Sequence, residues 1–127
     1  MVPYRMTMDE CPGYLHVVGE GDRTPENALR VLQDSYAACV ERGRRGLLLE
    51  VRFSGPSLGV SSIYRVIGER AIDGAALGRI AYVEAQMDDP DRARFAEMVA
   101  LNRGVNVRLF NDVEAARRWL GGTPGGR

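Results

Sequence analysis

The stretch Leu47-Leu48-Leu49 decides the fold, because three large apolar residues in succession suit a strand that is covered on both faces. Residues 79–84 repeat this pattern with the apolar run Ile80-Ala81-Tyr82-Val83. Strands of this kind are typical of parallel sheets, in which crossover helices lie on the faces. The two stretches therefore predict an α/β domain with a mostly parallel sheet.

Helix signals lie between these strands. Thr24-Pro25 is typical of a helix start, with threonine as the cap and proline in the first turn, and Gly43 is typical of a helix end. Asp89-Pro90 and Gly104 mark another helix in the same way. The side chains expected to face the core are Leu29, Leu32, Tyr36, Cys39 and Val40 in the first of these helices, and Phe95, Met98, Val99 and Leu101 in the other.

The N-terminal part predicts an antiparallel hairpin. Residues 3–9 alternate between apolar and polar side chains, which is the period of a half-buried strand. Cys11-Pro12-Gly13-Tyr14 has the residue pattern of a type II turn, and residues 14–19 form the expected second strand. The run Gly19-Glu20-Gly21-Asp22-Arg23 is expected to be a loop.

The remaining segments complete the order β-β-α-β-α-β-α-β-α. After a loop over residues 54–60, Ser61 or Ser62 is expected to cap a helix that directs Ile63, Val66, Ile67 and Ala71 inward. A last strand over residues 105–110 precedes a capping box of Asn111 and Glu114. The final helix is expected to turn one apolar face inward, made of Val113, Ala116, Trp119 and Leu120.

The whole pattern predicts one domain over residues 1–120 and a disordered tail over residues 121–127. Because strands alternate with helices, we expect right-handed crossovers and a mixed, mostly parallel sheet with an antiparallel hairpin at the N-terminus.

Composition limits the function. The 17 basic residues balance 17 acidic residues, whereas a nucleic-acid partner or an anionic membrane would favour a basic surplus. All basic residues are arginine, which excludes a Schiff-base lysine and a P-loop lysine. Cys11 and Cys39 lie far apart, as expected of incidental thiols in a reducing compartment. We find no signal segment, and no apolar run approaches the length of ~20 residues that a membrane span needs. We therefore expect a cytoplasmic protein without a membrane span.

Three stretches together resemble one family. They are the strand and helix start from Leu47 to Ser62, the passage from Phe95 to Phe110, and the ending Asn111-Asp112-Val113-Glu114-Ala115-Ala116-Arg117-Arg118-Trp119-Leu120. This combination resembles the SpoIIAA-like branch of the STAS/CRAL-TRIO-type fold. The resemblance implies a right-handed β/α superhelix and a non-enzymatic binding or regulatory role. It also implies a phosphorylatable serine at the start of the helix after the central strand, here Ser61 or Ser62. Val60 stands where that family has an acidic neighbour.

Ligands of parallel α/β sheets bind beyond the carboxyl ends of the strands. The candidate ligand-binding residues there are Arg52, Ser54, Ser57 and Asn111. Ser61 and Ser62 are candidates for a phosphoacceptor or an anion site, because a helix N-terminus offers free N–H donors. The alternative is that a serine there simply caps the helix.

No metal site or cofactor is expected, and the chain shows no complete catalytic motif. His16 is the single histidine and is expected to face solvent from an early strand. Glu50 and Glu84 lie near strand ends and could form a carboxylate pair, although the sequence does not fix their separation. Neither signal predicts an enzyme.

The leading hypothesis is therefore a protein-binding module of the STAS/SpoIIAA-like type. It would act through an unidentified protein partner or as a homodimer. Its contact surface would be the exposed edge strand of the N-terminal hairpin or the helix that starts near Ser61. The alternative is a carrier of a small apolar or lipidic ligand, with a pocket covered by Ile63, Tyr64 and Ile67. A small hydrolase that uses His16 is the third hypothesis.

Overall fold

The computed structural model describes residues 2–84 and 89–121, and within them the elements follow the predicted order. The strands are β1 (Arg5–Cys11), β2 (Tyr14–Asp22), β3 (Gly46–Ser54), β4 (Arg79–Val83) and β5 (Val107–Phe110). The helices are α1 (Pro25–Glu41), α2 (Val60–Ala75), α3 (Pro90–Asn102) and α4 (Val113–Gly121). Apart from Gly121, the tail predicted to be disordered lies outside the described residues.

The five strands form one sheet in the order β1-β2-β3-β4-β5. β1 pairs antiparallel with β2 across the turn at Gly13, whose φ of 85° suits a type II turn. All other neighbours pair in parallel. Because each parallel strand lies beside its predecessor, the chain coils as a β/α superhelix, and the predicted fold class is confirmed.

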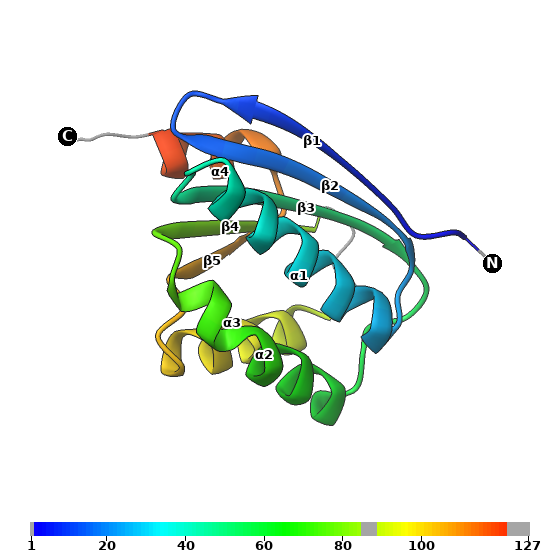
Figure 1. Cartoon of the computed structure of the whole chain (residues 1–127). Coiled ribbons are helices and arrows are strands. Elements are labelled where there is room, and N and C mark those ends of the chain that lie inside the picture. Colours follow the sequence, from blue (N-terminus) through cyan, green and yellow to red (C-terminus); the bar gives the residue numbers. More distant parts are fainter. Residues whose placement is uncertain (1, 85–88, 122–127) are drawn as a thin grey trace.

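The two faces of the sheet have different covers. Leu47 and Leu49 belong to a large core cluster with side chains of α1, α2 and α3, whereas Leu48 belongs to a smaller cluster with Ala116 of α4. All three leucines are 0% exposed, as expected of a strand covered on both sides. Figure 1 shows α1 across one face of the sheet and α4 behind the other.

Helix α2 packs mainly on other helices and not on the sheet. Its main contacts are with α1 and α3, while α1 also packs on β2 and β3, and α3 packs on β5. Val66 and Ala71 of α2 are buried at these contacts. α2 therefore bridges its two neighbouring helices and roofs the space between them and the sheet.

The loop predicted over residues 19–23 is wrong, because β2 continues to Asp22. The glycines there allow close packing within a strand. A Cβ on Gly19 would come within 2.6 Å of Val31 in α1, and one on Gly21 within 3.1 Å of the Tyr4 backbone. Gly21 also has a φ of 143°, which few other residues adopt. The glycines that indicated a loop thus serve close approach instead.

Two predicted helix caps are also wrong. The N-cap of α2 is Gly59, which makes no side-chain cap, and Ser61 and Ser62 lie inside the first turn. In α4 the capping side chain is Asp112, whose carboxylate accepts from the backbone N–H groups of Glu114 and Ala115, so Asn111 is not the cap. The caps at Thr24 and Asp89 are confirmed.

Three residues predicted to face the core are exposed: Val40 by 68%, Met98 by 52% and Leu101 by 49%. Each lies next to the buried stripe of its helix, beside Cys39 in α1 or beside Val99 and Ala100 in α3. Successive helical residues point about 100° apart, so one position decides burial. Among the described residues, none of the helices is long and apolar enough to cross a membrane.

Leu48→Ala should lower the free energy of unfolding by about 2–5 kcal/mol, because it leaves a cavity between the sheet and α4. Val40→Ala truncates an apolar side chain that is already 68% exposed, so it should change the free energy of unfolding by less than about 0.5 kcal/mol. Urea denaturation measures both variants. Equal losses would contradict the burial of Leu48 on the α4 side of the sheet.

Candidate functional site

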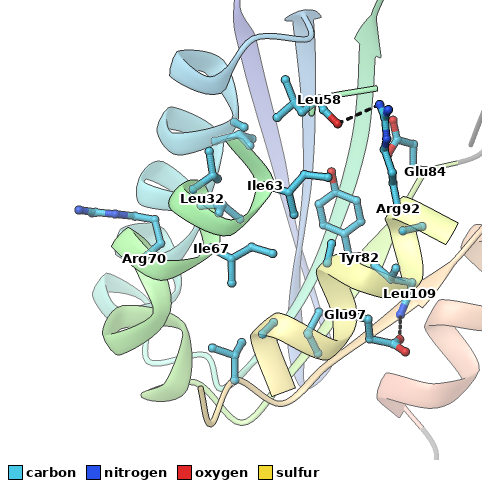
Figure 2. A pocket seen from close by; sticks show the side chains of 18 of the residues that line it. Leu32, Leu58, Ile63, Ile67, Arg70, Tyr82, Glu84, Arg92, Glu97 and Leu109 are labelled. Carbon is cyan, nitrogen blue, oxygen red and sulfur yellow. Dashed lines mark hydrogen bonds between the residues drawn. The ribbon is translucent and has the colours of Figure 1, made fainter. Parts of the chain in front are cut away.

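A partly open cavity of about 180 Å³ lies between the sheet and helices α1, α2 and α3. Most of its lining is apolar and comes from four sources. These are Val31, Leu32 and Tyr36 of α1, Ile63, Val66, Ile67 and Ala71 of α2, Ala93, Ala96 and Ala100 of α3, and Phe53, Ile80, Val107 and Leu109 of the sheet. Figure 2 shows Ile63 and Ile67 entering it from α2, opposite Tyr82.

The lining becomes polar in one direction along β4. Ile80, Tyr82 and Glu84 point to the same side, since alternate residues of a strand share a face, and all three line the cavity. A two-residue step is roughly 6.6 Å, so about 13 Å separates Ile80 from Glu84. The cavity thus runs from an aliphatic residue, past a phenol, to a carboxylate at the carboxyl end of the strand.

Arg23 is the partner of Glu84, and the two form an ion pair. Their side chains are 11% and 16% exposed. The same guanidinium donates to the carbonyls of Gly55 and Phe53, at 2.7 Å and 3.1 Å. Arg23 therefore connects the ends of β2, β3 and β4 at one point and has its charge balanced there.

Arg92 forms the second arginine contact at this end. Its guanidinium forms an ion pair with Asp89 at 3.2 Å and donates to the carbonyls of Ser57 and Leu58 at 3.4 Å and 3.2 Å. The contacts tie the loop between β3 and α2 to the start of α3. Figure 2 shows Leu58, Glu84 and Arg92 together at one end of the cavity. We call Arg23, Glu84, Asp89 and Arg92 the polar end.

The two phenols that line the cavity stay neutral at physiological pH. Burial raises the pKa of Tyr82 above its usual value, and the nearby carboxylate of Glu84 adds to the effect. Burial likewise raises the pKa of Tyr36. A neutral phenol is both a hydrogen-bond donor and an acceptor. The lining therefore includes two neutral phenols among its aliphatic side chains, in addition to the charged polar end.

Among the predicted ligand-binding residues, Ser57 lines this cavity. Arg52 alternates with Val51 and Phe53 of the large cluster, so it points to the α4 side of the sheet, where it forms an ion pair with Glu50 at 2.8 Å. The others are not part of the lining, and Ser54, Ser61 and Asn111 are exposed while Ser62 is half-buried.

Sequence reasoning missed Tyr82, Arg23 and Arg92. The available signal was position: Arg23 directly follows β2, and Arg92 lies in the first turn of α3. Tyr82 stood inside a run interpreted as purely apolar, although alternation within that strand assigns it to the side of Ile80. The proposed pair of Glu50 and Glu84 does not form, because Glu50 pairs with His16 and Arg52 whereas Glu84 pairs with Arg23.

A second polar cluster lies on the α4 side of the sheet. His16 Nε2 is 3.1 Å from Glu50, and Nδ1 is 3.2 Å from Arg117 of α4, which also donates to the Tyr14 hydroxyl. Arginine only donates, so Nδ1 accepts and Nε2 carries the hydrogen that is donated to Glu50. The expectation of a solvent-facing histidine is wrong: its side chain is 12% exposed and attaches α4 to the sheet.

Within residues 2–84 and 89–121, no group of three or more histidine, cysteine or acidic residues is placed to hold a metal ion. Neither protein-family models nor curated proteins give a match to this chain. Function is therefore argued from the site itself.

Glu50 supplies a prediction on pH. Burial pushes the pKa of its carboxyl upward, but the hydrogen bonds from Arg52 and His16 outweigh burial and hold it below the ordinary value of 4.5. A lowered folded-state pKa contributes stability that is complete above the unfolded-state pKa and is lost as pH falls through the folded-state pKa. Between about pH 5 and pH 3, the free energy of unfolding should fall more steeply for the wild type than for Glu50→Gln. Urea titrations measure the slopes, and parallel curves would contradict the assignment.

Proposed function

We propose that the protein binds a small, mostly apolar molecule in the cavity between the sheet and α1, α2 and α3, as a carrier or a sensor. The observation that supports this is the cavity of about 180 Å³ with its largely aliphatic lining. Protein interiors are close-packed, and voids larger than a water molecule are few. A space of this size reduces packing and therefore lowers stability unless a ligand fills it.

The volume sets the size of the ligand. An engineered, dry, apolar cavity of about 150 Å³ takes up benzene. A cavity of about 180 Å³ accordingly suits a molecule with roughly six to ten non-hydrogen atoms, or one end of a longer chain. Burying such a molecule removes apolar surface from water, which contributes roughly 25 cal/mol for each Å².

Toluene should bind to the wild type and raise its midpoint of thermal unfolding, because the ligand stabilises the folded state only. Ala96→Phe places a ring in the cavity from α3 and should abolish this rise. Ala37→Phe, on the exposed side of α1, is the matched control and should keep it. Differential scanning calorimetry with and without toluene measures the shift.

The methyl groups of Ile67 and Val107 provide a second readout, since both residues line the cavity. Toluene should shift their NMR signals in the wild type and in Ala37→Phe. The proposal fails if the wild type shows neither the thermal shift nor the methyl shifts.

A second candidate is a protein-binding role of the STAS/SpoIIAA-like type, carried out as a homodimer through α2. The supporting observation is a row of residues at four-residue spacing on its outer side, Val60, Tyr64, Gly68 and Ile72. Ile72 is 87% exposed, and Val60 and Tyr64 are each 52% exposed. The row repeats under two-fold symmetry: in an antiparallel pair of α2 helices, Val60 meets Ile72 and Tyr64 meets Gly68. The guanidinium of Arg103, which stacks on the Tyr64 ring and lies over Gly68, would be part of that contact.

Sedimentation velocity tests this second candidate. The wild type should sediment as a dimer, and Ile72→Glu should sediment as a monomer because charges would then face Val60 across the interface. Met98→Glu, at a residue of α3 that is 52% exposed, is the matched control and should remain dimeric. A wild type that stays monomeric at its highest soluble concentration would exclude the homodimer.

A further inference from the structure

The chemistry of the ligand follows from how charge is arranged around the cavity, and this inference rests on the proposed function. Three arginines and three carboxylates line the cavity: Arg23, Arg70, Arg92, Glu84, Asp89 and Glu97. At the polar end the charges of Arg23 and Arg92 balance those of Glu84 and Asp89. A site for an ion would instead leave an excess of the opposite charge facing the ligand.

Each of these groups already has a partner within the fold. Arg23 pairs with Glu84, and Arg92 pairs with Asp89. Glu97 accepts from the backbone N–H of Leu109 at 2.8 Å, and Arg70 extends away from the cavity to pair with Asp73 at 3.3 Å. A ligand carboxylate would lie beside Glu84 and an ammonium group beside Arg23, so either charge would be buried next to one of its own sign.

Most hydrogen-bonding side chains of the lining are nevertheless gathered at the polar end. The inward residues of β4 place the Tyr82 hydroxyl between the apolar part, marked by Ile80, and the polar end, marked by Glu84. Figure 2 shows the Tyr82 ring crossing the cavity with its oxygen toward Leu58. A ligand that lies along this strand has its tail among aliphatic side chains and its head beside a neutral phenol.

We propose that the natural ligand is an uncharged amphiphile, an alcohol or carbonyl compound with a short apolar tail, whose head is hydrogen-bonded by Tyr82 at the polar end. A hydroxyl or carbonyl group can share the hydrogen bonds of the phenol without upsetting the pairs Arg23–Glu84 and Arg92–Asp89. Its tail lies toward Ile80 and Val107.

A matched ligand series tests this proposal. Isothermal titration calorimetry compares 1-hexanol with hexanoate and hexylammonium, which have the same tail and a charged head, and with toluene, which has no polar head. We expect 1-hexanol to bind most tightly and both ions to bind at least about ten-fold more weakly, because their heads would be desolvated beside a like charge. Equal or tighter binding of either ion would overturn the proposal.

Variants separate the contribution of the ligand's polar head to binding from that of its apolar tail. Tyr82→Phe removes the hydroxyl and keeps the ring. It should therefore lower the affinity for 1-hexanol several-fold and leave the affinity for toluene unchanged. Tyr64→Phe, on the exposed side of α2, is the matched control and should change neither. Glu84→Gln leaves the charge of Arg23 unbalanced and should shift the preference toward hexanoate.

The outcomes distinguish a failure of the proposed function from a failure of the proposed ligand chemistry. If toluene produces neither the thermal shift nor the methyl shifts in the wild type, the proposed function fails. If toluene binds but 1-hexanol shows no advantage over hexanoate, or Tyr82→Phe keeps full affinity for 1-hexanol, the cavity remains a ligand site and the uncharged amphiphile is wrong. Circular dichroism shows whether each variant is folded before it is titrated.

Discussion

The burial of β3 on both faces is the constraint on which the rest of the structure depends. Leu47 and Leu49 need a cover on one side and Leu48 needs one on the other, so the chain must supply helices to both. The three helices that alternate with the parallel strands cover one face, and α4, which follows the last strand, covers part of the other. The polar cluster of His16, Glu50 and Arg117 then attaches α4 where apolar contact ends.

The same coverage produces the cavity. On the face that carries three helices, α2 packs mainly on its neighbours α1 and α3 rather than on the sheet. Small side chains on α3, among them Ala93 and Ala96, leave the space beneath it unfilled. A close-packed protein gains stability when such space is filled, which is why we propose a ligand for the cavity of about 180 Å³.

The charged residues make the two ends of the cavity chemically different. The carboxyl ends of the parallel strands bring Arg23 and Glu84 together, and the start of α3 adds Asp89 and Arg92. Buried charges are costly unless paired, and the nearly buried Arg23 and Glu84 neutralise each other, while the half-exposed Arg92 and Asp89 form a second pair. This arrangement is the basis of our proposal that the site prefers a neutral head to a charged one. The exposed row on α2 is a separate surface, since Val60, Tyr64 and Ile72 are absent from the cavity lining.

The sequence by itself determined the element order, the parallel pairing and the buried strands, because the runs at Leu47 and Ile80 and the caps at Thr24 and Asp89 act locally. It also predicted a ligand site at the carboxyl ends of the strands, which stays a prediction; the polar end of the cavity lies there. The tertiary structure alone decided that Gly19 and Gly21 lie in a strand, that Val40 faces solvent, and that Arg23 meets Glu84. Those outcomes depend on which residues approach one another in the fold, as Arg23 and Glu84 do across 61 positions of chain, and no local pattern encodes such contacts.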